Sequence, residues 1–145
     1  MLREEEQITA KQPVTGKTLL VVEDDLDNRE LFTLALVSLT SYHVLSADSP
    51  ATALRLINHS KPDLFLIDYR LPDMNGLALY DQLHAIPGLE HVPALLINAG
   101  LSDGVRHEAE QRKLVMLEKP FDLDDFLHVI HRMLGQPPPE AMPES

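Results

Sequence analysis

Asp63-Leu-Phe-Leu-Ile-Asp68, followed by Tyr69-Arg-Leu-Pro-Asp-Met-Asn-Gly76, is the stretch that decides the fold of this chain. The apolar residues before Asp68 are continuous, which is typical of a parallel strand that is covered on both faces. The residues after Asp68 are rich in Pro, Asp, Asn and Gly, which favour turns. We therefore predict a buried strand that ends at a candidate functional carboxylate, Asp68.

Three other apolar runs also end in polar residues. Leu19–Val22 runs into Glu23-Asp24-Asp25, Leu95–Ile97 into Asn98-Ala99, and Leu114–Leu117 into Glu118-Lys119-Pro120. We predict five strands, over Thr18–Val22, His43–Ala47, Asp63–Ile67, Ala94–Ile97 and Leu114–Leu117. The second of these alternates more than the others, so we place it at an edge of the sheet.

Amphipathic segments fill the gaps between the predicted strands. The first expected helix is capped by Asp27 and Glu30 and carries Leu31, Leu34, Ala35, Val37 and Leu39. The next three are a helix that begins at Ser49-Pro50, the segment Gly76–Ala85 and the polar segment Asp103–Gln111. The last is capped by Asp122 and carries Phe126, Leu127, Ile130 and Leu134. Strict alternation of strands and helices predicts a doubly wound α/β fold with right-handed crossovers. Five strands favour the flavodoxin-like sheet order 2-1-3-4-5, with ligands at the carboxyl ends of the strands.

Length and composition limit the classes of function. With 145 residues, the chain has room for one domain, which we place at 17–135, between a flexible extension at 1–16 and a Pro-rich tail at 136–145. Cysteine is absent and the formal net charge is −11, which argues against Cys-ligated metals and against nonspecific nucleic-acid binding. No apolar run approaches the roughly 18 residues of a membrane span. We expect a cytoplasmic protein.

The acidic residues at the strand ends predict a metal site. If Glu23, Asp24 and Asp68 converge, two carboxylates about 4 Å apart repel by roughly 4 kcal/mol at an effective dielectric of about 20, so a cation is required. Oxygen ligands in an open, hydrated site favour Mg²⁺. An aspartate beside Mg²⁺ can attack a phosphoryl group, and Lys119 would add a second positive contact.

The chain resembles the receiver domain of bacterial two-component response regulators over about residues 17–135. The matching signatures are Val22-Glu23-Asp24-Asp25, Asp68 through Gly76, and Lys119-Pro120-Phe121. The resemblance implies that Asp68 accepts phosphate from a histidine kinase or a histidine phosphotransfer protein. It also implies that Glu23, Asp24, Asp68 and the main-chain carbonyl of Arg70 hold Mg²⁺, that Lys119 contacts the phosphoryl group, and that the Lys119–Pro120 bond is cis. For Asp25 we favour a solvated or helix-capping role over metal binding.

Two positions depart from the family pattern. Asn98 stands where the family usually has Thr or Ser, and Met116 stands where it commonly has Tyr or Phe. A carboxamide is bulkier than a hydroxyl, and a thioether lacks the distinct inward and outward rotamers of an aromatic ring. We therefore expect phosphotransfer with weakened conformational switching, in a single-domain regulator that acts by contact with a downstream protein as a monomer or weak homodimer.

Several alternatives remain open. The chain could be a receiver-fold scaffold whose contacts with partners do not depend on phosphorylation. If it is instead a phosphorylated switch, it catalyses its own phosphorylation and hydrolysis, and whether it is then called an enzyme is a matter of definition. A phosphatase of the haloacid dehalogenase type would need a second Asp where Arg70 stands. The histidines, among them His84 and the pair His128 and His131, are predicted to lie on the surface, and Phe121 to pack in the core.

Overall fold

Five parallel strands form one sheet with the order β2-β1-β3-β4-β5, which confirms the predicted flavodoxin-like order. The strands are β1 (Thr18–Val22), β2 (His43–Ala47), β3 (Leu64–Asp68), β4 (Ala94–Asn98) and β5 (Val115–Glu118). Among the described strands, β2 and β5 lie at the edges of the sheet, because each pairs with one neighbour. This computed structural model describes residues 16–135, so most of the predicted extension at 1–16 and all of the tail at 136–145 lie outside the described residues.

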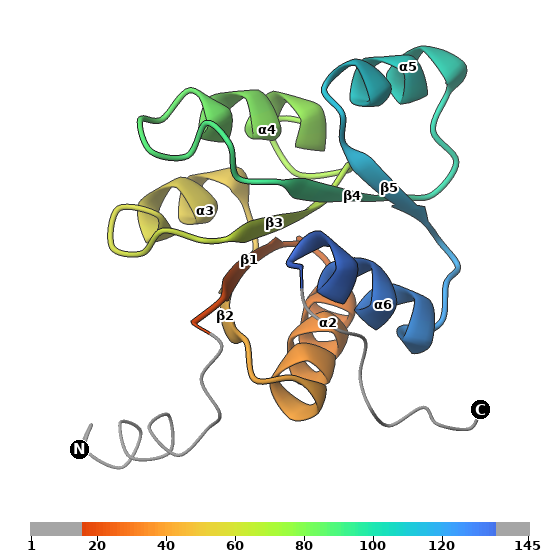
Figure 1. The fold of residues 1–145 in the computed structure, drawn as a ribbon. Helices are drawn as coiled ribbons and strands as arrows, with labels where there is room; N and C mark the ends of the chain where they lie inside the picture. The colour runs from red at the N-terminus through yellow and green to blue at the C-terminus, as the bar shows by residue number, and fades with distance from the viewer. Residues whose placement is uncertain (1–15, 136–145) are drawn as a thin grey trace.

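In the part of the chain that the structure describes, helices cover both faces of the sheet (Figure 1). They are α2 (Leu26–Leu39), α3 (Pro50–Leu56), α4 (Gly76–His84), α5 (Asp103–Gln111) and α6 (Leu123–Met133). Figure 1 shows α2 and α6 on one face, and α3, α4 and α5 on the other. Within residues 16–135, no helix is long and apolar enough to cross a membrane.

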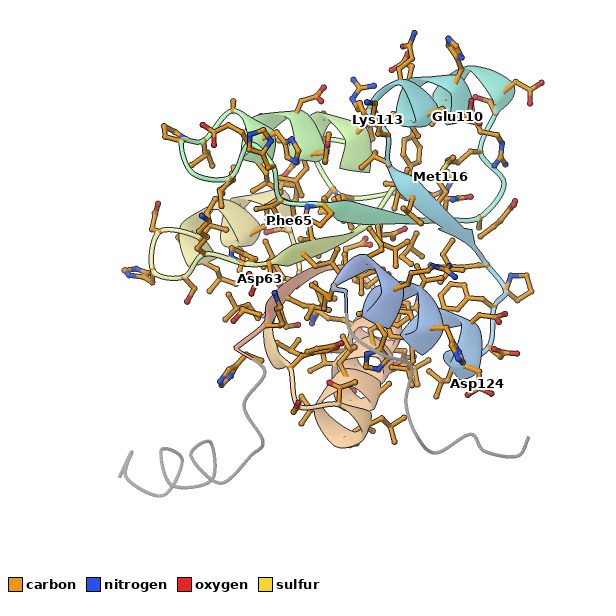
Figure 2. All side chains as sticks on the ribbon, in the orientation of Figure 1. Asp63, Phe65, Glu110, Lys113, Met116 and Asp124 are labelled. Carbon is orange, nitrogen blue, oxygen red and sulfur yellow. The ribbon has the colours of Figure 1, made fainter. Side chains whose placement is uncertain are left out.

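Each face of the sheet has its own apolar core, because side chains alternate along a strand. Leu64 and Leu66 pack with Phe32 of α2 and Phe126 of α6. Phe65 and Ile67 pack on the opposite face, with residues of α3, α4 and α5. Figure 2 labels Phe65 and Met116, which share this second face. The predicted stripe of α6 is core, and Phe121 stacks on Phe126 as expected.

Two of the three predicted helix caps are confirmed, and the third, at α2, is not. The side chains of Ser49 and Asp122 accept from main-chain N–H groups at the starts of α3 and α6, as predicted. The prediction that Asp27 caps α2 is wrong. The cap is Asp25, whose carboxylate accepts from the N–H of Asn28 at 2.9 Å, so the helix begins directly after the acidic cluster.

The buried face of α2 also differs from the predicted apolar pattern. The sheet covers Phe32, Ala35 and Leu36. By contrast, Leu31, Leu34, Val37 and Leu39 are exposed. A helix that is apolar on nearly every side gives no periodic signal for the face that the core will cover.

Two histidines predicted to lie on the surface are not surface residues. His131 is buried, and its Nδ1 lies 2.6 Å from the hydroxyl oxygen of Tyr42, 89 positions away in the sequence. His84 is half-buried, with its Nε2 2.7 Å from the carbonyl oxygen of Val92. Tyr42 is distant from His131 in the sequence, and Val92 lies in the loop after α4, eight residues from His84, so helix spacing reveals neither partner.

Candidate functional site

The polar residues that end the strands meet at one edge of the sheet. In the parallel register, Val22 pairs with Ile67, Asp68 with Ile97, and Asn98 with Glu118. Glu23, Asp68, Asn98 and Lys119 therefore follow one another across four adjacent strands. Three strand ends lie one residue later than predicted, because Asp68, Asn98 and Glu118 belong to β3, β4 and β5 themselves.

Three carboxylates converge at this edge. Glu23, Asp24 and Asp68 each offer an oxygen, and these three atoms lie within 4.8 Å of one another. Glu23 and Asp68 are only 2% and 7% exposed, whereas Asp24 is open to solvent. The structure thus brings together the three acids expected to hold a metal ion.

Burial and mutual repulsion keep two of these acids from ionising normally. Burial first, and then the nearby charge of Asp68, raise the pKa of Glu23 from 4.5 to about 7. Burial likewise raises the pKa of Asp68, although the charge of Lys119 and hydrogen bonds from Glu23 and the main chain of Arg70 oppose that effect. Two such acids favour a bound cation, which lets both ionise.

Lys119 provides the nearest positive charge. Its Nζ lies 3.9 Å from Glu23 Oε1, and its side chain is partly exposed. The Lys119–Pro120 peptide bond is cis, which confirms the expectation from the resemblance. The main-chain N–H of Lys119 donates to the carbonyl of Asn98 at 2.7 Å and so joins the ends of β4 and β5.

The buried side-chain amide of Asn98 has unsatisfied polar atoms in the described part of the chain. It is 2% exposed, and neither its Oδ1 nor its Nδ2 has a hydrogen-bond partner among residues 16–135. Unpaired buried amide atoms cost roughly 1–3 kcal/mol each. Met116, on the neighbouring strand, is half-buried and packs against the core cluster on the side of α4 and α5.

The sequence did not single out two residues that shape this site. Gly76 lies against the backbone of Asp68, since a Cβ built on it would be 2.7 Å from the Asp68 carbonyl oxygen. Arg29, one turn into α2, donates from its guanidinium to the carbonyl of Glu23 at 2.9 Å. Arg29 lies six residues after Glu23, and Gly76 lies eight residues after Asp68. Each contact crosses a turn between a strand and a helix, where the regular spacing of either element gives no signal.

Comparison with known proteins gives a consistent result. A profile of the response regulator receiver domain matches residues 19–131. The chain is 33% identical over 124 residues to the transcriptional regulatory protein GlrR of Escherichia coli, but it spans only 27% of that protein's length. It is 29% identical over 120 residues to the polar-differentiation response regulator DivK of Brucella ovis, covering 82% of this chain and 97% of DivK.

Solved structures show the same architecture. The non-phosphorylated receiver domain of HemR from Leptospira biflexa is 27% identical, with a TM-score of 0.74, and the match covers 86% of this chain and 98% of that one. The receiver domain of a sensor histidine kinase from Pseudomonas aeruginosa is 26% identical, with a TM-score of 0.73, over 83% of this chain and 98% of that one. That domain has a magnesium ion coordinated in its active-site cleft.

Proposed function

The chain belongs to the response regulator receiver domain family, and on this premise we propose that Asp68 accepts a phosphoryl group from a phosphohistidine. The single observation that carries the proposal is the convergence of Glu23, Asp24 and Asp68 within 4.8 Å at the carboxyl edge of the sheet. The donor would be a sensor histidine kinase or a histidine phosphotransfer protein. We also propose that the exchange takes place in the cytoplasm, whose reducing conditions suit a cysteine-free chain.

The residues at the site fit a magnesium ion. The three carboxylates are hard oxygen ligands, the type that Mg²⁺ prefers, and the main-chain carbonyl of Arg70 would be a further ligand of this type. Glu23 Oε1 is buried and has no hydrogen-bond partner in the described part of the chain, so it is available to a cation or to a water on that cation. Asp24 and Asp68 would hold the ion directly and Glu23 through water. The bound ion would neutralise charge on the transferring phosphoryl group.

The protein's own residues have distinct roles in this reaction. A carboxylate oxygen of Asp68 would form the new bond to phosphorus as the bond from phosphorus to the donor imidazole nitrogen breaks. Lys119 would contact a phosphoryl oxygen and stabilise its negative charge. Because burial raises the pKa of Asp68, the nearby positive charges are needed to keep its carboxylate ionised and nucleophilic.

We propose that Asn98 and Met116 weaken the conformational response to phosphorylation. The unpaired Nδ2 of Asn98 supports a role as donor to a phosphoryl oxygen, a contact that a longer side chain can make without drawing the end of β4 inward. Met116 has no ring to move between two rotamers. Moving an equilibrium from 1:99 to 99:1 needs about 5.5 kcal/mol, so partial loss of coupling leaves a mixed population. Output would pass by contact to a downstream protein.

A direct test is incubation with Mg²⁺ and acetyl phosphate, followed by intact mass measurement. We expect one base-labile phosphoryl adduct on the wild type and none on Asp68→Asn. Asp73→Asn is the matched control, because Asp73 is an exposed aspartate in the following loop whose positive φ of 71° Asn also tolerates. An unmodified wild type, or an adduct that persists in Asp68→Asn, contradicts the proposal.

The coupling needs a separate measurement. Amide chemical shifts of α5 and β5, recorded with and without a beryllofluoride phosphate mimic, should move little in the wild type and more in Asn98→Thr. Large and equal movements in both proteins contradict weakened switching while leaving phosphotransfer intact.

The second candidate function is a scaffold whose partner contacts ignore phosphorylation. The same two residues, Asn98 and Met116, favour it, whereas the assembled acids and Lys119 oppose it. An adduct on Asp68 with no change in β5 would support a scaffold that retains the chemistry.

A further inference from the structure

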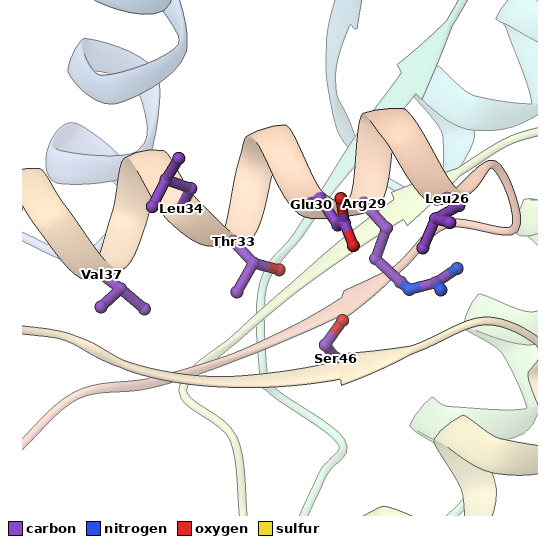
Figure 3. A pocket seen from close by; sticks show the side chains of 7 residues that line it. All are labelled: Leu26, Arg29, Glu30, Thr33, Leu34, Val37 and Ser46. Atoms are coloured by element: carbon purple, nitrogen blue, oxygen red, sulfur yellow. The ribbon is translucent and has the colours of Figure 1, made fainter.

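Arg29 of α2 contacts the acidic cluster through the main chain. Its Nη1 donates to the carbonyl oxygen of Glu23 at 2.9 Å. Figure 3 shows the Arg29 side chain reaching from α2 toward β2, where it lines a groove together with Leu26 and Ser46. The side chain thus crosses from the helix to the residue that directly follows β1.

The carbonyl that Arg29 binds belongs to the peptide unit between two of the proposed metal ligands, Glu23 and Asp24. A peptide unit is planar, so a contact that fixes its oxygen also fixes the direction in which the chain enters Asp24. The Asp24 side chain is open to solvent, where packing does not set its direction. The position of its carboxylate therefore depends on the main chain that carries it.

Two other hydrogen bonds hold Glu23, but neither reaches this peptide unit. The Glu23 N–H donates to the carbonyl of Ala47 at 3.0 Å and joins the residue to the end of β2. The Oε2 of Glu23 accepts from the N–H of Asp25 at 3.1 Å, which orients one oxygen of its carboxylate. Arg29 supplies the contact at the carbonyl, and a buried carbonyl without a partner is costly.

The start of α2 gives Arg29 a firm support. Its main-chain N–H donates to the Asp25 carbonyl at 2.9 Å, and the Asp25 carboxylate caps the helix at the N–H of Asn28. A hydrogen bond from a charged donor is stronger than one between neutral groups. The planar guanidinium also loses less conformational freedom per hydrogen bond than a lysine side chain does.

We propose that Arg29 is a positioning residue for the metal site. It fixes the peptide between Glu23 and Asp24, so that their carboxylates meet that of Asp68. The inference rests on the proposed function, because it concerns the Mg²⁺ that these three acids would hold. Residues that orient metal ligands from outside the coordination shell typically contribute about 10–100-fold to metal affinity.

Titration of the full chain with Mg²⁺, followed by the amide chemical shifts of β1 and β3, tests the proposal. Arg29→Met keeps an apolar side chain in the groove but loses the donor, and it should raise the Mg²⁺ dissociation constant about tenfold. Loss of positive charge alone has the opposite sign, because a cation binds more tightly when a nearby positive charge is removed. An unchanged or lower dissociation constant in Arg29→Met overturns the inference.

Two further variants complete the titration. Arg29→Lys replaces the guanidinium with a shorter donor of the same charge, so it should weaken Mg²⁺ binding by a smaller factor. It decides the question if Arg29→Met does not fold, and wild-type affinity in Arg29→Lys then overturns the inference. Arg55→Met is the matched control, because Arg55 is an exposed residue of α3 whose Nη2 lies 3.5 Å from Thr52 Oγ1. It should leave the dissociation constant unchanged.

Hydrogen exchange in EDTA tests the same contact without the metal. The Asp25 N–H, which is bonded to Glu23 Oε2, should exchange about tenfold faster in Arg29→Met, because the segment then opens locally. Exchange at the wild-type rate means that Arg29 does not hold the segment, and the inference is then wrong.

Failure of this inference is distinguishable from failure of the proposed function. A wild type whose chemical shifts do not respond to Mg²⁺ overturns the metal site, and the role of Arg29 with it. A wild type that binds Mg²⁺ no more tightly than Arg29→Met overturns the role of Arg29 alone.

Discussion

Gly76, the first residue of α4, holds the backbone of Asp68 in place by leaving room for it. A Cβ added at position 76 would lie 2.7 Å from the Asp68 carbonyl oxygen and 3.0 Å from both Tyr69 Cα and Leu96 Cδ1. Two of these three neighbours are backbone atoms of the strand end that carries the candidate phosphoacceptor. The Gly76 N–H also donates to the Tyr69 carbonyl at 2.7 Å, so the two segments cannot separate freely.

We expect Gly76→Ala to destabilise the protein by about 1–2 kcal/mol. Overpacking a well-filled core costs typically 1–3 kcal/mol. The better helix propensity of Ala, at most about 1 kcal/mol, offsets part of that cost. The displacement falls on Asp68, so phosphorylation by acetyl phosphate should slow by about tenfold, since small misplacements of a reacting group reduce rates steeply.

Urea unfolding and the rate of adduct formation measure the two effects. Gly104→Ala is the matched control, because Gly104 lies in α5 with nothing within 4 Å of its added Cβ. That variant should be more stable than the wild type by up to about 1 kcal/mol, with an unchanged phosphorylation rate. The reasoning is wrong if Gly76→Ala is as stable as Gly104→Ala, or if Gly76→Ala is phosphorylated at the wild-type rate. Either result would mean that the close packing of Gly76 against Asp68 has no energetic consequence.

Three further predictions concern ionisation, a buried hydrogen bond and a helix cap. The pKa of Glu23 is raised from 4.5 to about 7, so as the pH rises the Glu23 carboxyl ionises in the unfolded chain before it ionises in the folded protein. Without Mg²⁺, Glu23 should therefore lower the free energy of unfolding progressively between pH 4.5 and 7, by at most about 3 kcal/mol. Urea titrations in EDTA should show Glu23→Gln gaining stability relative to the wild type from pH 4.5 to 7, and a constant difference contradicts the shift. Tyr42→Phe removes the 2.6 Å partner of buried His131 Nδ1 and should cost about 1–3 kcal/mol in equilibrium unfolding, whereas a neutral effect means that the pair does not stabilise the fold. Asp25→Ala removes the acceptor for the Asn28 N–H and should cost about 1 kcal/mol, and Asp25→Asn, which keeps an acceptor, should restore most of it in thermal unfolding.

The strand and helix positions followed from the sequence because their causes are local. The predicted Thr18–Val22, His43–Ala47 and Asp103–Gln111 coincide with β1, β2 and α5. Ser49 and Asp122 act as helix caps through neighbours three residues away. The sequence failed locally where two signals competed, since Asp25 and Asp27 both suit the start of α2 and only Asp25 caps it.

The candidate site was predictable for a different reason. In a parallel sheet every strand delivers its last residue to the same edge, so Glu23, Asp68, Asn98 and Lys119 had to meet once the strands were placed. What the sequence could not supply was the environment of each residue. The raised pKa of Glu23 comes mainly from burial, and the side-chain amide of Asn98 is buried without a hydrogen-bond partner among residues 16–135.

The sequence by itself determined the order of strands and helices, the polar ends of the strands and the edge at which those ends collect, because each depends on residues close together in the chain. Tertiary structure alone decided which side of α2 faces the core, that His131 is buried against Tyr42, and that Gly76 touches Asp68. Those outcomes depend on how the surfaces of separate strands and helices fit together. A helix apolar on nearly every side, or a glycine whose neighbour lies eight residues earlier, carries no local sign of that fit.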